Sequence, residues 1–264
     1  MKKVLSELTV SLCILGSFWL LLSKIEWTSM FGIDKDNDNL EEQIGKLYGQ
    51  YLEQEQDKLA SPDISIVVDS LRTHIFIAKD ISRESIKLHV VNRDIENAYV
   101  APGRYMVVFT GMLKKCANES ELAGVLGHEL AHIEKKHAMK KLIRQTGLAV
   151  LVGMVSGNGG IETGAELGRV LSSASYSREM ESEADLTAVD YLIKAEINPE
   201  PFAELMFQFG SINDKLPGPL KYLSTHPGSE DRAIEIIHYI KKGHSFKPVL
   251  QDATWQKMKE AVKE

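Results

Sequence analysis

The chain has 264 residues, of which 44% are hydrophobic and 26% are charged, so it can bury the core of one large domain or two small ones. Its formal net charge of -6 argues against a nucleic-acid-binding surface, because phosphate binders usually carry a basic excess. We therefore expect a folded globular protein with no nucleic-acid partner. The cysteines, Cys13 and Cys116, lie in unlike segments, which argues against an intramolecular disulfide and leaves the redox compartment open.

Residues 1–28 are predicted to form a membrane anchor. Two lysines at the start precede an uncharged apolar run, Leu8 to Leu22. This run is short for a spanning helix, but a snorkelling Lys24 can extend it. No small-x-small cleavage pattern follows, so we favour an anchor that is retained over a cleaved signal peptide or a buried helix. The leading lysines place the N-terminus in the cytoplasm and the domain in the periplasm or outside the cell.

Residues 29–60 are predicted to contain a polar linker and a first helix. The acidic stretch IDKDNDNL imitates the start of a calcium loop, but Asn39 and Gly45 stand where such a loop needs Gly and Glu. We therefore interpret it as a linker that caps the next helix. Apolar residues recur at helical spacing from Leu40 to Tyr51, and a second helix is expected after Pro62.

A small antiparallel sheet is predicted in the middle of the chain. The stretch IKLHVVN alternates from Ile86, and the run from Asn97 to Gly111 is divided by the turn signal Pro102-Gly103. An edge strand of such a sheet can accept an extended peptide by strand addition.

A long helix is predicted after this sheet. Asn118 and Glu121 form a capping-box pattern, so the helix should begin there and run through His137, with a possible extension to Gln145. The apolar stretch 147–160 is too short to span a bilayer, and we expect a buried or interfacial hairpin, with a second membrane contact as the alternative.

Helical periodicity resumes from Glu166 and continues beyond the break INPEPF into two further helices. The last of these is expected over Ser229 to Lys242.

The stretch GVLGHELAHIEKKH contains the pattern His-Glu-x-x-His. On a helix, His128 and His132 lie about 40° apart around the axis, so both imidazoles can bind one metal ion. Glu129 lies about 100° further round from His128, beside the metal, where it can take a proton from a zinc-bound water. The pattern predicts a zinc site, and two structural histidines are the alternative.

A third protein ligand must come from elsewhere in the chain. The metzincin pattern requires Gly and His where this sequence has Glu134 and Ala138, so that class is excluded. His137 follows His128 by nine positions, about 180° round a continuous helix, and we expect it to be a surface or second-layer residue. Glu134 is expected at the surface.

A second helix offers the missing ligand in the stretch YSREMESEADLTA. Glu181 and Asp185 share one helical face, so Glu181 can bind zinc while Asp185 accepts the ring N–H of a histidine ligand such as His128. Glu179 and Glu183 then point elsewhere and are expected to be solvated. The small Ala184 and Ala188 would allow a close approach of the two helices.

Four motifs together resemble a known family: HELAH, SREMESEAD, NAYVAPGRYMVVFTGML and STHPGSEDR. They are similar to the zinc metalloendopeptidases that include HtpX, the Ste-type CAAX prenyl proteases, the Oma-type proteases, and BepA and LoiP. The similarity spans roughly Ile64 to Lys242. It implies a mainly helical α+β zincin-type domain over residues 61–264, one Zn²⁺ per chain, and a small antiparallel sheet whose edge strand borders the active site.

The resemblance also implies a substrate-binding strand within Asn97 to Phe109. Its expected contact residues are Asn97, Ala98, Tyr99, Val100, Tyr105 and Val107. The family usually has two glycines after the proline, whereas this chain has Gly103-Arg104, which leaves the local turn open.

By the same resemblance, His226 lies on a loop near the zinc. It would stabilise the oxyanion or occupy the fourth zinc position in a resting enzyme, and a helix-entry residue before Pro227 is the alternative. Arg232 would clamp a substrate carbonyl or pair with Glu181 or Asp185. Together with Glu129, His226 and Arg232 are the catalytic candidates.

We therefore expect a zinc metalloendopeptidase that acts on extended, unfolded or misfolded envelope proteins. Glu129 would deprotonate a zinc-bound water and return the proton to the leaving amine. The domain would be anchored to a bacterial inner membrane and face the periplasm, or be secreted there. A zinc-containing chaperone or assembly factor and a prenyl-protein protease are the alternatives, although only one segment approaches spanning length.

Overall fold

The computed structural model of the chain describes residues 33–55, 58–157, 160–212, 221–240 and 243–263. It divides into two compact units, Met1–Glu41 and Glu42–Glu264, and all further description concerns the second unit unless stated. The predicted anchor at residues 1–28 lies outside the described residues. Among those that are described, no helix combines the length and the apolarity needed to cross a membrane.

The first described helices are α3 (Ile33–Gln54) and α4 (Pro62–Lys79). The predicted polar linker is wrong in its conformation, because α3 already begins at Ile33. Its acidic first turns suit a helix N-terminus, where backbone N–H groups favour negative charge. α4 begins with Pro62 as predicted, and Asp80 ends it in the left-handed conformation (φ 58°).

The sheet has three strands, β1 (Lys87–Val91), β2 (Ala98–Ala101) and β3 (Tyr105–Phe109), in the order β1-β3-β2. A short 3₁₀ helix, η2 (Arg83–Ser85), precedes β1. β2 and β3 are antiparallel as predicted, but β1 is parallel to β3, so the sheet is mixed.

The connection after β1 explains the difference from the predicted antiparallel sheet. The Arg93 carbonyl accepts hydrogen bonds from Gly111 N and Thr110 Oγ1, both at 3.0 Å, just beyond the end of β3. The segment 92–97 therefore crosses over the end of β3 and delivers β2 to its far side. Alternation of side chains reveals which residues form strands, but it does not reveal which strands are neighbours.

The turn between β2 and β3 contains Gly103-Arg104, where the family usually has two glycines. Gly103 and Arg104 both have left-handed backbone conformations, with φ of 78° and 63°. A glycine adopts this conformation easily, whereas an arginine is strained there. Arg104 gains a compensating contact, since its Nε donates to the Ser85 carbonyl at 2.7 Å.

The central helices are α5 (Thr110–Lys115), α6 (Glu119–Glu134), α7 (His137–Thr146), α8 (Leu148–Ser156) and α9 (Ile161–Ser173). Asn118 caps α6 as predicted, because its Oδ1 accepts from Glu121 N at 2.9 Å. The predicted continuous helix is wrong beyond Glu134: Lys136 adopts a left-handed conformation (φ 53°), and α7 starts in a new direction.

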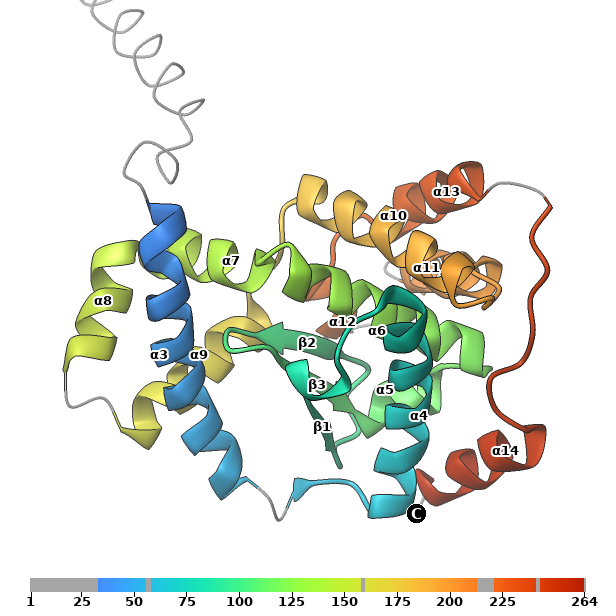
Figure 1. Cartoon of the computed structure of the whole chain (residues 1–264), viewed down its shortest axis with the longest axis horizontal. Coiled ribbons are helices and arrows are strands. Elements are labelled where there is room, and N and C mark those ends of the chain that lie inside the picture. The colour runs from blue at the N-terminus through green and yellow to red at the C-terminus, as the bar shows by residue number, and fades with distance from the viewer. Residues whose placement is uncertain (1–32, 56–57, 158–159, 213–220, 241–242, 264) are drawn as a thin grey trace, which may run out of the picture. The chain divides into compact units, whose positions relative to one another are not determined.

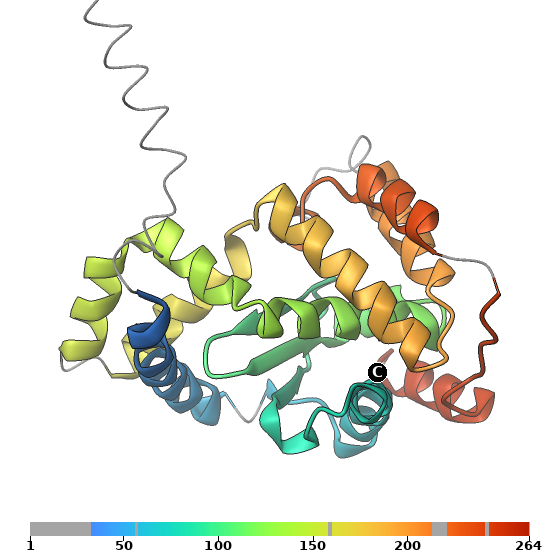
Figure 2. The same cartoon turned by 45° about the horizontal axis from the view of Figure 1, so that its top comes forward.

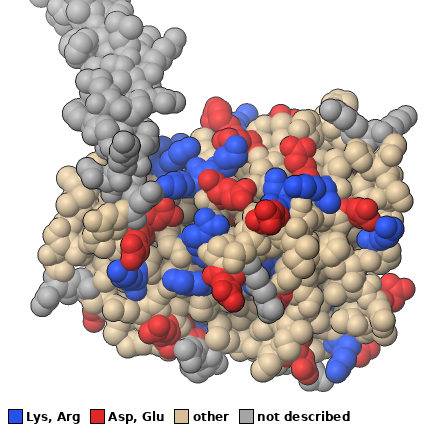
Figure 3. Space-filling model, viewed as in Figure 1, with Lys and Arg blue, Asp and Glu red and all other residues tan. Residues whose placement is uncertain are grey.

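Helix α8 is exposed, which contradicts a buried hairpin. Leu151 is its one buried residue, and Val150 and Val152 are 49% and 45% exposed. The helix contains no charged residue, and the surface at the left of Figure 3, where Figure 1 places α8, is correspondingly free of charged side chains.

The C-terminal part contains α10 (Arg178–Lys194), α11 (Glu200–Ile212), α12 (Lys221–Thr225), α13 (Ser229–Tyr239) and α14 (Asp252–Ala261). α9 begins five residues before the predicted Glu166, and α13 ends at Tyr239 instead of residue 242. Figures 1 and 2 show α10, α11 and α13 gathered beside α6, and each of them packs against at least one other helix of this group. The mainly helical α+β class is thus confirmed.

Small residues allow the helices next to α6 to approach it closely. Ala184 and Ala188 of α10 are fully buried, and Ala188 faces Gly127 of α6. On the side of α11, a Cβ placed on Gly124 would lie 2.4 Å from Cβ and Cγ of Phe202. Position 124 therefore has no room for a methyl group.

We predict that Gly124→Ala lowers the free energy of unfolding by about 1–3 kcal/mol, because the added methyl overpacks the α6–α11 contact. Gly153→Ala in α8 is the matched control, since a Cβ there meets nothing within 4 Å. It should raise stability by about 0.5–1 kcal/mol through helix propensity. Denaturant titration followed by circular dichroism measures both, and equal stability of Gly124→Ala and the parent would contradict the packing described here.

Candidate metal centre

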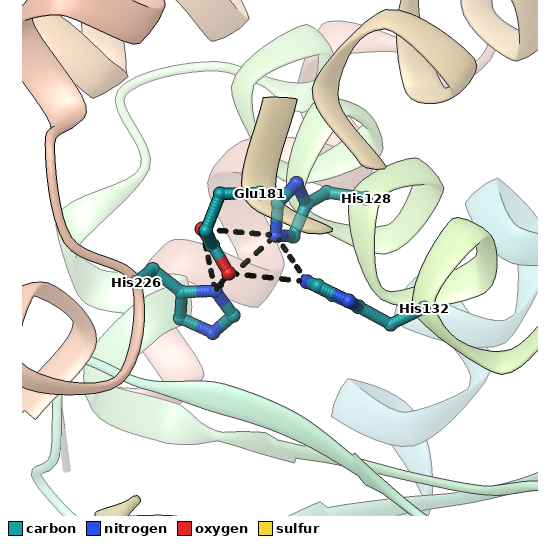
Figure 4. A group of neighbouring side chains, drawn as sticks. All are labelled: His128, His132, Glu181 and His226. Atoms are coloured by element: carbon teal, nitrogen blue, oxygen red, sulfur yellow. Dashed lines mark hydrogen bonds and ion pairs between the residues drawn. The ribbon is translucent and has the colours of Figure 1, made fainter. Parts of the chain in front are cut away.

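Two imidazoles of α6 form the first part of a donor cluster. His128 and His132 lie one helical turn apart, and both side chains are completely buried. Their Nε2 atoms are 2.9 Å apart and point toward the same space (Figure 4). The spacing of four residues produces the convergence that the sequence predicted.

Helix α10 supplies a carboxylate to the same space. Ser177 begins this helix with its hydroxyl accepting from Met180 N, and Glu181 follows in the first turn. Glu181 is completely buried, with Oε1 at 3.4 Å from His132 Nε2 and Oε2 at 3.8 Å from His128 Nε2.

His226 joins these three residues from the segment that follows α12. Its Nδ1 lies 3.0 and 3.1 Å from the two Glu181 oxygens and 3.2 Å from His128 Nε2. The ring of Tyr222 stacks on it with centroids 4.3 Å apart. Of the two roles left open by the sequence, this position corresponds to the fourth donor (Figure 4).

The four residues fit a zinc ion. One ligand atom from each lies within 4.8 Å of all the others, among the described residues. Bonds of about 2.0–2.1 Å in a tetrahedron would separate ligand atoms by about 3.3 Å, close to most of the distances above. Imidazole nitrogens and a carboxylate oxygen are also the ligand types that zinc accepts.

A buried arginine holds the second carboxylate of α10 in place. Asp185 Oδ1 lies 2.8 Å from His128 Nδ1, where it accepts the ring N–H and leaves Nε2 free for the metal. Arg232 of α13 donates to Asp185 from Nε at 2.5 Å and from Nη2 at 2.7 Å, and its Nη1 pairs with Glu181. Arg232 is therefore engaged by two carboxylates, which is the pairing named as one of its two expected roles.

These charges shift the pKa values of their partners. Although burial opposes the shift, His226 and Arg232 hold the pKa of Glu181 well below its usual range. Burial similarly opposes the shift at Asp185, but Arg232 and His128 keep its pKa low. Burial also disfavours the charged form of His128, yet the Asp185 carboxylate raises its pKa overall.

Glu129 lies beside the donors without joining them. It is completely buried, and neither of its carboxylate oxygens accepts a hydrogen bond within the described part of the chain. Its Oε1 lies 3.5 Å from His226 Nε2. Burial raises the pKa of Glu129 to about 7, which suits a group that must accept and release a proton near neutrality.

Of the two positions expected for His137, the structure shows the second-layer one and not the surface one. His137 is completely buried, and its Nδ1 lies 2.8 Å from His132 Nδ1. The surface prediction assumed a continuous helix, and the left-handed turn at Lys136 redirects the chain so that His137 returns to the centre. Neither Gly nor Pro marks this turn in the sequence. Glu134, by contrast, is exposed as expected.

Two further residues near the centre have no motif that would reveal them. The Tyr176 ring stacks on His132 with centroids 3.9 Å apart, and Lys141 Nζ lies 3.8 Å from the Tyr176 centroid. Lys141 also donates to the carbonyls of Leu171 and Ala174 at 2.9 and 3.3 Å, and burial lowers its pKa to about 8. This buried amine ties the C-terminal end of α9 to α7.

The expected substrate strand is divided between two strands. Ala98, Tyr99 and Val100 lie on the edge strand β2, next to Asn97. Tyr105 and Val107 lie on β3, whose backbone is paired on both sides, so they can contribute only side chains. All six expected contact residues are buried.

Two histidine donors on consecutive turns, a carboxylate donor from a second helix and a non-ligating glutamate between the histidines are the arrangement of a metal-dependent peptidase. The sequence signature of Peptidase family M48 matches residues 67–240. The chain belongs to this family.

Curated relatives agree with this assignment. The chain is 27% identical to the mitochondrial metalloendopeptidase OMA1 of Schizosaccharomyces pombe over 180 residues, which is 67% of this chain and 53% of that protein. It is 25% identical to the beta-barrel assembly-enhancing protease of Escherichia coli strain K12 over 207 residues, 73% of this chain and 42% of that protein. The chain is 23% identical to the beta-barrel assembly-enhancing protease of Yersinia pestis over 201 residues, which is 72% of this chain and 41% of that protein. The chain thus spans about half or less of the length of these relatives.

We predict that Arg232→Gln destabilises the zinc-free protein by about 3–5 kcal/mol, because Asp185 and Glu181 lose their buried cation. In the Arg232→Gln background, Asp185→Asn removes one of the two uncompensated charges. The double variant should therefore lose about 0.5–3 kcal/mol less stability than the two single variants lose in sum. Denaturant titrations of the four proteins measure this coupling, and strictly additive effects would refute a direct buried pair.

Proposed function

We propose that the chain is a zinc-dependent metalloendopeptidase that cleaves peptide bonds of extended polypeptides. The observation that carries the proposal is the buried, unbonded carboxylate of Glu129 beside a cluster of four convergent donors. A buried carboxylate without hydrogen bonds is costly unless it serves a purpose, and proton transfer is such a purpose. Membership of Peptidase family M48 supports the same reaction.

The residues of the metal centre would have separate roles in the reaction. His128, His132 and Glu181 would hold the zinc, and His226 would take the fourth position only in a resting state, because a catalytic zinc needs one open position for water. Zinc would supply a Lewis acid that activates water and polarises the scissile carbonyl. Glu129 accepts a proton from the attacking water and passes it to the nitrogen of the leaving amine.

Strand β2 is the proposed binding edge for the substrate. Phe109 N donates to Asn97 O, so Asn97 belongs to a hydrogen-bonded pair, and alternation along an antiparallel ladder turns the backbone groups of Ala98 and Val100 away from β3. Leu59 forms a bridge with Val91, so the end of the opposite edge of the sheet, on β1, is already paired.

The substrate would lie with alternate side chains on opposite faces of the sheet. On one face, Tyr99 and Val107 line a groove of about 250 Å³ together with Tyr51 and Arg169. Because β2 is buried, a peptide must displace covering side chains to reach it. This requirement favours flexible, unfolded chains, and with the apolar N-terminal run it supports a role in protein quality control at a membrane of the bacterial envelope.

We predict that Glu129→Gln lowers the rate of casein cleavage by about 10²–10⁴-fold while the protein keeps one zinc per chain. Glu134→Gln is the matched control, because Glu134 is exposed on the same helix and should leave the rate unchanged. Cleavage by purified full-length protein and zinc analysis of the same samples provide the measurements. A Glu129→Gln variant that digests casein normally would leave a chaperone or assembly role and refute the peptidase mechanism.

Strand addition also predicts a pattern in the substrate. N-methylation removes one backbone donor at a time, so a methylation scan through a cleaved peptide should reduce kcat/KM at every second position near the scissile bond. The loss at each sensitive position should be about tenfold, equivalent to one hydrogen bond. A uniform loss, or none, would contradict binding along β2.

A further inference from the structure

A chain of hydrogen bonds leads from the donor His132 to the surface. His137 is the first residue of α7 and is completely buried. Its Nδ1 lies 2.8 Å from His132 Nδ1, and its Nε2 lies 3.2 Å from Glu183 Oε2. Glu183 is 46% exposed and pairs at 2.8 Å with Lys135, which is 40% exposed.

The positions of the protons in this chain follow from its geometry. His132 turns Nε2 toward His128 and Glu181, so this nitrogen must offer a lone pair to the metal. A neutral His132 then carries its proton on Nδ1 and donates to His137 Nδ1. His137, as acceptor at Nδ1, carries its own proton on Nε2 and donates to the Glu183 carboxylate. Every nitrogen in the chain thus has one compatible role.

The two histidine donors of α6 are supported in different ways. His128 donates directly to the buried Asp185. Glu183 lies two positions earlier on α10, about 200° around the helix from Asp185, and therefore faces away from the donors. His137 bridges this distance, and the turn at Lys136 that ends α6 brings it into place.

We propose that His137 and Glu183 are positioning residues for His132, so that the zinc affinity of the buried centre depends on a solvent-exposed carboxylate. Their hydrogen bonds fix the Nδ1–H tautomer of His132 and raise the basicity of its Nε2. This inference rests on the proposed zinc site, and it gives a role to Glu183, which the sequence analysis expected only to be solvated.

Zinc affinity of the full-length protein, measured by competition with a chromophoric chelator, tests the proposal without an activity assay. His137→Leu should raise the zinc Kd about 10–100-fold, because it removes the acceptor for His132. His137→Asn offers an amide oxygen near the position of Nδ1 and should recover most of that affinity. Glu183→Gln should raise the Kd by about tenfold, the lower end of the range for such partners.

Glu179→Gln is the matched control, since it removes the same charge from an exposed position on the same helix. It should leave the Kd unchanged. Equal effects of Glu179→Gln and Glu183→Gln would indicate a general surface charge effect and overturn the proposal. The proposal would also be overturned if His137→Leu folds and binds zinc as tightly as the parent, and if Glu183→Gln and His137→Asn do so as well.

The surface variant Glu183→Gln keeps the test decisive if His137→Leu does not fold. The outcome is also distinct from failure of the proposed function. A parent protein that binds zinc but does not cleave casein would refute the peptidase, whereas a cleaving parent with unchanged zinc Kd in the Glu183→Gln variant would refute only the role of the hydrogen-bond chain.

Discussion

The metal centre depends on one buried cation. Arg232 is 4% exposed and lies against two carboxylates of α10, Glu181 and Asp185, which burial alone would protonate. Its charge, together with His226 at Glu181 and His128 at Asp185, keeps the pKa values of both low, so Glu181 can act as a donor and Asp185 can orient His128. The same contacts bind α13 to α10, and α10 packs on α6. The contacts of Arg232 therefore serve both the packing of the helices and the ionisation of the metal-site carboxylates.

Much of the centre could be predicted from the sequence because it is encoded in local helical spacing. His128, Glu129 and His132 share one helix, and Glu181 and Asp185 share another, so the period of 3.6 residues fixes their relative directions. The packing of α6 on α10 then brings the two groups together. The caps at Asn118 and Ser177 mark where these helices begin.

The errors arose where the conformation depends on long-range contacts. The turn at Lys136 has no Gly or Pro signal, so the inward position of His137 could not be read from the sequence. The parallel pairing of β1 with β3 depends on hydrogen bonds of Arg93 with residues beyond β3. The contact of Tyr176 with His132 joins segments whose proximity only the folded chain creates. The exposure of α8 likewise depends on which helices pack beside it.

The order of the donors along the chain affects how the centre forms during synthesis. His128 and His132 are made first, Glu181 follows, and His226 and Arg232 come last. Until that last segment has left the ribosome, the two carboxylates of α10 lack their cation and remain unfavourable to bury. A nascent chain therefore cannot complete its metal centre before α13 has been synthesised, because α6, α10 and α13 must pack together to form it.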